Sequence, residues 1–154
     1  MEARARSANS CILISASCTT GWLDWVHGEL WLCDEGLLRM SLGFFDTLEH
    51  GVRQGLRSTV GPERATRIFD YAQVRSIAMA DKRNRWIPWD EIGHARLKRG
   101  VIDHSLHLDL VDPSPRIGRS KFLWLKSDGG FEIVEAALAD RLGGRFQVVR
   151  KPIG

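Results

Sequence analysis

Apolar and polar residues alternate along several short stretches of the chain, with the period of a half-buried β-strand. The clearest cases are residues 28–32, 36–40, 106–110 and 121–125. The first two are connected through Asp34-Glu35-Gly36, which favours a hairpin because glycine accepts a positive φ. Pro88 keeps the apolar run from Ile87 to Ile92 extended, so this run predicts a further strand. Together these stretches predict a meander of antiparallel strands.

Two other stretches have the period of a helix. Asp70 and Gln73 have the spacing of a capping box, and we expect a short helix after them that ends near residue 81. Residues 131–142 predict a C-terminal helix, which Gly143 ends. Its apolar stripe consists of Phe131, Val134, Leu138 and Leu142. Strands followed by one amphipathic helix predict an α+β fold.

The pattern is less regular in two parts of the chain. Residues 1–26 combine two early arginines with an apolar patch too short for a signal peptide, and we interpret them as a partly flexible N-terminal extension. Residues 27–150 then form one domain, in which residues 43–84 are an irregular insertion carrying the short helix. No run approaches the roughly 20 apolar residues of a membrane span.

Charge and cysteine content restrict the function only weakly. The chain has 22 basic and 19 acidic residues in 154, a mixed balance that identifies no partner. Cys11, Cys18 and Cys33 are odd in number and match neither a disulfide framework nor, together with His27, a zinc spacing. We therefore expect buried free thiols, no metal and a cytoplasmic location.

Six tryptophans are more informative than the charge. Tryptophan is usually well buried, so a core role is favoured for most of them. Two or more at one end of the sheet would instead make a ligand or peptide site. The position of Trp89 within the apolar run favours the core for this residue, with a loss of roughly 3–5 kcal/mol expected for Trp89→Ala.

No catalytic arrangement is visible in the sequence. Asp90 and Glu91 are adjacent, so on a strand they would point to opposite faces and could not act as a pair. His104 and His107 lie near a predicted turn without an evident third partner. We expect a protein that is not an enzyme and that needs no cofactor.

The order and spacing of these pieces resemble the pleckstrin-homology-like (PH-like) superfamily, in particular bacterial PH-like and GRAM-like proteins of an actinobacterial type. The resemblance covers about residues 27–148 and rests on the Gly-x-Leu-x-Leu hairpin, the Ile-x-Trp-x-x-Ile run, the alternating strands and the closing helix. It implies a strongly bent antiparallel sheet or partly open barrel, closed by the C-terminal helix. It also implies a binding or scaffolding module. In this chain the loop of the first hairpin is acidic, which argues against phosphoinositide recognition.

Two functional hypotheses follow. The first is a PH-like module that binds a protein segment, along a sheet edge or between sheet and helix. The alternative is binding to an anionic surface, lipid headgroups or nucleic acid, through basic loops, and it requires the basic residues to converge on one face. The candidate residues are Lys82, Arg83, Arg85, Arg96, Lys98, Arg99, Arg116, Arg119 and Lys121.

Overall fold

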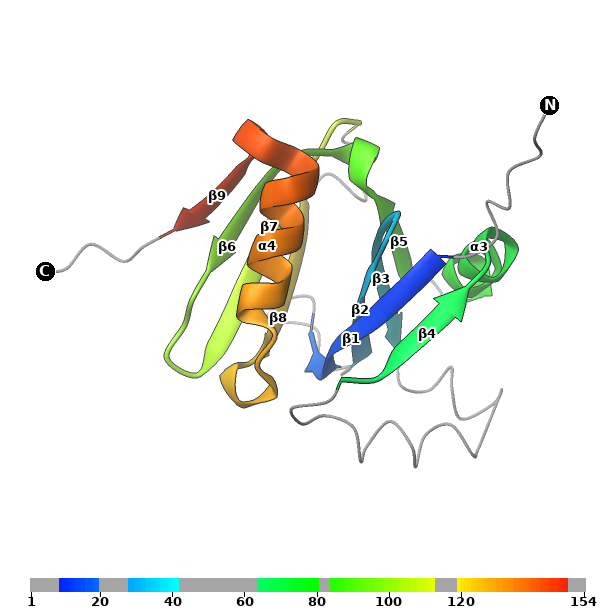
Figure 1. Cartoon of the computed structure of the whole chain (residues 1–154), viewed down its shortest axis with the longest axis horizontal. Coiled ribbons are helices and arrows are strands. Elements are labelled where there is room, and N and C mark those ends of the chain that lie inside the picture. Colours follow the sequence, from blue (N-terminus) through cyan, green and yellow to red (C-terminus); the bar gives the residue numbers. More distant parts are fainter. Residues whose placement is uncertain (1–8, 20–27, 42–63, 81–83, 113–118, 150–154) are drawn as a thin grey trace, which may run out of the picture.

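The computed structural model describes residues 9–19, 28–41, 64–80, 84–112 and 119–149. These residues form an α+β fold, the class that the sequence predicts, and consist of two sheets and two helices, with neither sheet closed nor strongly curled (Figure 1). In spatial order, sheet A contains β4 (Thr66–Phe69), β1 (Asn9–Cys18), β2 (Gly28–Cys33), β3 (Gly36–Ser41) and β5 (Arg85–Pro88), all antiparallel.

Sheet B has four strands and is mixed. Its spatial order is β8 (Arg119–Leu125), β7 (Asp103–Leu110), β6 (Ile92–Lys98) and β9 (Phe146–Val149), with β9 parallel to β6. The helices are α3 (Tyr71–Ala80) and α4 (Phe131–Leu142). Three 3-10 turns complete the described elements: η1 (Trp89–Glu91), η2 (Lys126–Asp128) and η3 (Gly143–Arg145).

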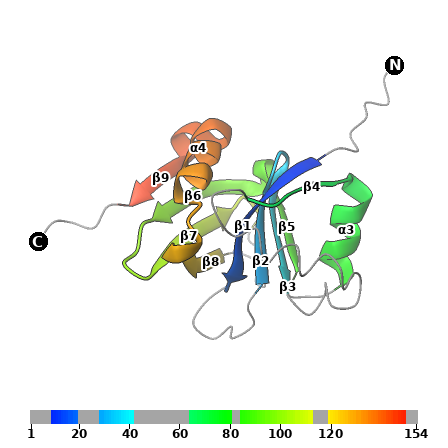
Figure 2. The same ribbon diagram turned by 60° about the horizontal axis from the view of Figure 1, so that its bottom comes forward.

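Sheet A is buried on both faces, because each face has its own apolar layer. On one face Trp31, Leu38 and Met40 pack in a cluster with the buried side chains of α3. On the other face, Leu30, Leu32 and Leu37 join the inner residues of sheet B and the apolar stripe of α4 in a larger cluster. Sheet A consequently lies between the two helices (Figure 2).

Strand β1 connects the two sheets. Register shifts near Ser15 and before Cys18 interrupt its pairing with β2. At its end, Thr19 exchanges two 2.8 Å backbone hydrogen bonds with Leu123 of β8. Bulges increase the bend and twist of a strand, which lets β1 leave one sheet and reach the other.

Side chains reinforce this junction. The hydroxyls of Ser15 and Ser17 donate to Oδ2 of Asp128 at 2.7 and 2.6 Å. The Arg64 guanidinium donates to the carbonyl oxygens of Ile14 at 2.8 Å and of Asp128 at 2.6 Å. The junction between β1 and the turn before α4 is therefore a polar network in which the fully buried Ser15 has its acceptor.

We expect Asp128→Ala to lower the free energy of unfolding by about 1–3 kcal/mol, because it leaves a buried hydroxyl without its acceptor. Chemical denaturation monitored by tryptophan fluorescence measures the change. Asp112→Ala, which removes an exposed carboxylate, is the control and should shift the free energy by less than about 0.5 kcal/mol. Equal effects of the two substitutions would show that the network adds nothing to stability.

Several local predictions are confirmed. The first hairpin forms as expected, and α4 has the predicted bounds and buried stripe. The capping box of α3 is complete: Gln73 N donates to Asp70 Oδ1 at 2.7 Å and Asp70 N donates to Gln73 Oε1 at 2.9 Å. Gly36 is required for a different reason from the one expected: it has no positive φ, and a Cβ there would collide with the carbonyl oxygen of Ile87 on β5.

Other predictions are wrong. Residues 9–18 belong to sheet A as β1 and not to an extension, and residues 66–69 of the irregular insertion form the edge strand β4. The single strongly bent sheet is replaced by two sheets. The run from Ile87 to Ile92 is not one strand, because η1 interrupts it where the chain passes from sheet A to sheet B. The rest of the expected extension, residues 1–8 and 20–26, and most of the expected insertion, residues 43–63 and 81–83, lie outside the described residues.

The cysteine prediction is partly wrong. Cys11 and Cys33 are register partners on β1 and β2 and form a disulfide. Cys18 is a buried free thiol, as expected. Disulfides are unusual in cytoplasmic proteins, so this pair argues against the expected cytoplasmic location.

Candidate functional site

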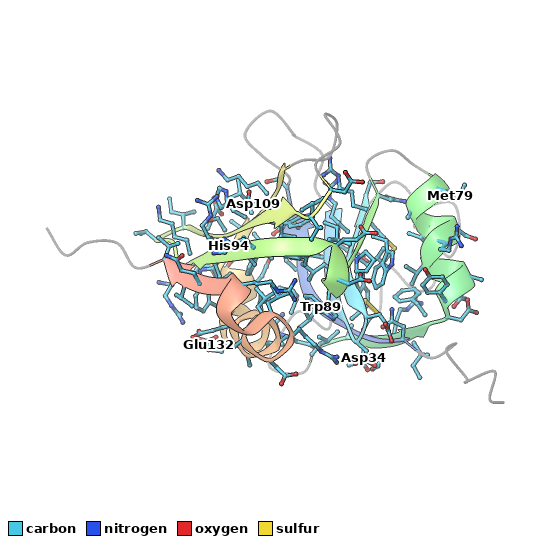
Figure 3. All side chains as sticks on the ribbon, turned by 90° about the horizontal axis from the view of Figure 1, so that it is seen from above. Asp34, Met79, Trp89, His94, Asp109 and Glu132 are labelled. Carbon is cyan, nitrogen blue, oxygen red and sulfur yellow. A yellow bond between two sulfur atoms is a disulfide. The ribbon has the colours of Figure 1, made fainter. Side chains whose placement is uncertain are left out.

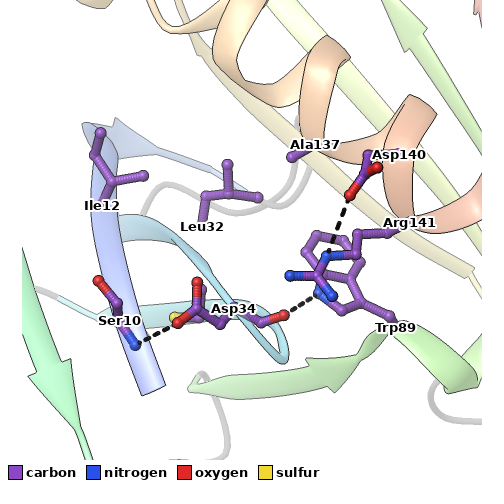
Figure 4. A pocket seen from close by; sticks show the side chains of 9 residues that line it. Ser10, Ile12, Leu32, Asp34, Trp89, Ala137, Asp140 and Arg141 are labelled. Carbon is purple, nitrogen blue, oxygen red and sulfur yellow. Dashed lines mark hydrogen bonds and ion pairs between the residues drawn. The ribbon is translucent and has the colours of Figure 1, made fainter. Parts of the chain in front are cut away.

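The 3-10 turn η1 is held against the β2–β3 turn by two hydrogen bonds from Trp89. Its backbone N–H donates to the carbonyl oxygen of Glu35 at 3.1 Å. Its indole Nε1 donates to the carbonyl oxygen of Asp34 at 2.8 Å, as Figure 4 shows. The ring is half-buried and packs at the edge of the larger apolar cluster. Trp89 is thus fixed in place while part of its ring stays open to solvent.

A hollow lies on each side of Trp89. The first, of about 250 Å³, lies between sheet A and α4, with Ile12, Leu32 and Ala137 as its apolar walls (Figure 4). The second, of about 430 Å³, lies beside β5 and is lined by Tyr71, Trp86 and Pro88 as well as by Trp89 itself. We call the two hollows together the Trp89 site. Figure 3 shows Trp89 and Asp34 between the two helices.

Acidic side chains line both hollows. Glu35, Asp90 and Glu91 border the second hollow, and Asp34 and Asp140 border the first. Within the part of the chain that the structure describes, the one basic lining residue is Arg141, whose Nε lies 3.9 Å from Asp140 Oδ2. A negative rim around exposed aromatic faces suits a cation, which such rings and carboxylates both attract.

The basic residues predicted to bind an anionic surface are only partly brought together. Arg96, Lys98 and Lys121 lie on the face of sheet B that points away from the core, where Arg96 and Lys121 are both register partners of His107. We call these three residues and His107 the basic face. Arg99 follows at the end of β6.

The remaining predicted basic residues do not join this face within the described structure. Arg85 lies on β5 in sheet A. The backbone of Arg119 belongs to β8, but its side chain is outside the described part, as are Lys82, Arg83 and Arg116. Asp109 partly offsets the positive charge, because its Oδ2 lies 3.9 Å from Arg96 Nη2.

The two histidines of β7 point to opposite sides of sheet B and cannot act together. Burial, followed by the charges of Lys121 and Arg96, lowers the pKa of His107 on the basic face. His104 is 2% exposed and lies in the core, with ring centroids 5.7 Å from Trp124 and 5.0 Å from Phe131. Its Nδ1 accepts a hydrogen bond from the Gly100 backbone N–H at 3.4 Å, which requires that nitrogen to be unprotonated.

Burial, then the nearby Arg99 and Lys126, lower the pKa of His104, while Glu132 and Asp103 act in the opposite direction. Because the unfolded chain binds this proton more readily, stability should fall as the pH drops through the unfolded pKa of 6.5 towards the lower folded value. We expect the melting temperature to decrease between pH 7.5 and 5.5. The decrease should be smaller in His104→Gln and smallest in His104→Gln/His107→Gln. An unchanged slope in the double variant would contradict this assignment.

The described residues show no arrangement for metal binding and no membrane-spanning helix. Nowhere in the described ranges do three or more His, Cys, Asp or Glu side chains gather to hold a metal ion. In the same ranges no helix is long and apolar enough to cross a bilayer. The Trp89 site offers two hollows, aromatic rings and negative charge, and the basic face offers positive charge. These features can bind a ligand.

Sequence reasoning missed the Trp89 site because it placed Asp90 and Glu91 on opposite faces of a strand. In η1 both instead border the same hollow. A signal was present in the sequence: the acidic pair 34–35 directly precedes Gly36, and the acidic pair 90–91 directly follows Trp89. Of the tryptophans, Trp31 and Trp124 lie in the core as expected, whereas Trp86 and Trp89 are half-buried at this site and Trp22 and Trp25 lie outside the described residues.

No protein-family model matches the chain, and no curated protein matches it either.

Proposed function

We propose that this protein is a non-catalytic binding module that recognises a protein segment carrying a basic side chain at the Trp89 site. The observation that carries the proposal is the half-buried ring of Trp89, which its hydrogen bond to Asp34 holds between two hollows lined by acidic side chains. Aromatic anchors in partly apolar hollows supply much of the binding energy in protein interfaces. The carboxylates would add selectivity for lysine or arginine and faster association.

The arrangement of the elements supports a PH-like assignment for the fold, which we also propose. Sheets A and B meet where Thr19, directly after β1, pairs with Leu123 of β8, and the apolar stripe of α4 packs into the cluster that both sheets share. Ligand sites are usually concave clefts, and one such cleft lies between sheet A and α4. The 250 Å³ hollow occupies that space, bounded by Leu32 of β2 and Ala137 of α4.

Peptide selection tests the function directly. A random dodecamer library displayed on phage would be selected on the folded protein, and the enriched peptides titrated by fluorescence anisotropy. We expect enriched sequences to contain lysine or arginine. We expect their affinity to fall at least about tenfold in Glu35→Gln/Asp90→Asn/Glu91→Gln, because the substitutions remove the charge and keep the shape.

The matched control removes the same charge elsewhere. Asp103→Asn/Asp109→Asn/Glu135→Gln changes three acidic residues on sheet B and α4, outside the linings of both hollows. It should leave peptide affinity within about twofold. Equal losses in the two triple variants would show a general charge effect and not a site. Enrichment of peptides without basic residues would also overturn the proposal.

A separate observation favours the alternative, binding to an anionic surface. Three of the predicted basic residues share the outer face of sheet B with His107. This face is formed by other strands than those that hold the Trp89 site, so the two activities would not compete for the same residues.

A further inference from the structure

The connection between β6 and β7 exposes aliphatic side chains at its tip. Val101 is 80% exposed and Ile102 is 72% exposed. Leu125 of β8, which is 41% exposed, lies beside them, because Asp103 is its register partner and Lys126 N donates to the Ile102 carbonyl oxygen at 2.8 Å. We call Val101, Ile102 and Leu125 the apolar tip.

The backbone beneath this tip is well defined. Residues 97 and 98 of β6 pair in register with residues 106 and 105 of β7. Gly100 permits the tight connection, because a Cβ at this position would collide with the carbonyl oxygen of Asp103. The aliphatic side chains are therefore presented on a paired hairpin, so they need little ordering when they bind.

Basic side chains surround the tip. Lys98 and Arg99 precede it, and Lys126 follows Leu125. The Arg99 guanidinium lies 4.0 Å from the centre of the Phe131 ring and 3.0 Å from Glu132 Oε1, which holds it at this end of sheet B. The basic face continues the positive charge along the same sheet through Arg96 and Lys121. Acidic residues are also near: Asp103 follows Ile102 in the sequence, Asp128 lies in the same 3-10 turn as Lys126, and Glu132 pairs with Arg99.

We propose that the apolar tip inserts into the surface of an anionic lipid bilayer, with Lys98, Arg99 and Lys126 at the level of the headgroups. Exposed aliphatic groups framed by cations match both layers of such a surface, the acyl boundary and the negative headgroups. A nucleic acid would use the cations, but it takes up aliphatic side chains only when they are wedged between base steps, and this unstacking costs about a few kcal/mol per step. The chemistry of the tip therefore selects the bilayer among anionic surfaces.

The proposed membrane contact leaves the Trp89 site accessible. The turn η1 directly precedes β6, whereas the apolar tip follows its last residue, so the two sites lie at opposite ends of this seven-residue strand. A strand of this length spans about 23 Å. The protein could then bind a bilayer at one end and a protein segment at the other.

The test uses sedimentation with vesicles of phosphatidylcholine containing 30% phosphatidylserine, at low and at moderate salt. We expect salt-sensitive binding that is at least tenfold weaker to pure phosphatidylcholine. Val101→Ser/Ile102→Ser should weaken it at least fivefold without changing the charge, and Lys98→Gln/Lys126→Gln should weaken it and reduce the salt dependence. Val111→Ser, which alters a 63% exposed valine after the far end of β7, is the matched control and should bind as the parent does.

An environment-sensitive fluorophore distinguishes insertion from surface attraction. Nitrobenzoxadiazole attached at Ile102→Cys should shift to the blue and brighten when the anionic vesicles are added, whereas the same label at Val111→Cys should not. Labelling is selective because Cys18 is buried and the other two cysteines are bonded to each other. An unshifted label at residue 102, or equal binding by Val101→Ser/Ile102→Ser, would overturn the proposal. Binding to a DNA duplex without binding to vesicles would overturn it as well.

Discussion

Replacing Trp31 by alanine should lower the free energy of unfolding by about 3–5 kcal/mol. Trp31 is fully buried between sheet A and α3, and its ring meets that of Phe69 edge-on at 5.7 Å between centroids. Its Nε1 also donates to Oε2 of Glu29 at 2.9 Å, and Glu29 is itself 1% exposed. Truncation therefore leaves a large cavity and removes a donor from a buried carboxylate. Urea denaturation measures the loss.

Two further variants separate these contributions. Trp31→Phe keeps most of the ring volume but removes the indole donor, so we expect a loss smaller than that of Trp31→Ala but still above about 1 kcal/mol. Trp89→Ala should cost only about 1–2 kcal/mol, less than the 3–5 kcal/mol expected from sequence, because the ring is half-buried. An equal loss for Trp31→Ala and Trp89→Ala would contradict the assignment of Trp31 to the core and Trp89 to a binding site.

Local chemistry made part of this fold predictable. Three features depend only on residues that are close in the sequence, and all three form as expected. They are the capping box of α3, the apolar stripe of α4 and the hairpin of β2 and β3. In sheet A, by contrast, the alternation of polar and apolar residues predicted the wrong exposure for two polar side chains. Glu29 and Arg39 alternate with apolar residues as if they faced solvent, yet both are 1% exposed.

Strand β1 was missed for a related reason. Its residues are mostly small or weakly polar, and it is buried along most of its length, so it shows no clean alternation. The alternation rule applies to strands with one solvated face, whereas β1 lies inside sheet A between β4 and β2.

The candidate site depends on contacts that no local pattern contains. The hydrogen bond from Trp89 to Asp34 joins residues 55 positions apart and places the acidic turn of the first hairpin beside Asp90 and Glu91. Each acidic pair is ordinary by itself, and only their juxtaposition around an aromatic ring suggests a ligand. By contrast, the alternation of β6, β7 and β8 did bring Arg96, Lys98 and Lys121 to one face.

Reduction of the Cys11–Cys33 disulfide should lower the free energy of unfolding by about 3 kcal/mol, the chain-entropy value for a separation of 22 residues. Both cysteines are at most 4% exposed, so the reductant gains access mainly when the protein opens, and the measurement compares urea denaturation of protein refolded with and without dithiothreitol. Cys11→Ala/Cys33→Ala should lose the response to dithiothreitol, and Cys18→Ser should keep it.

Alkylation of the denatured protein, taken directly from acid-quenched cells and followed by mass spectrometry, reports whether the disulfide is closed in the cell. One alkylated cysteine means a closed disulfide and an oxidising compartment, whereas three mean that the pair is reduced there and that the stabilisation is not used.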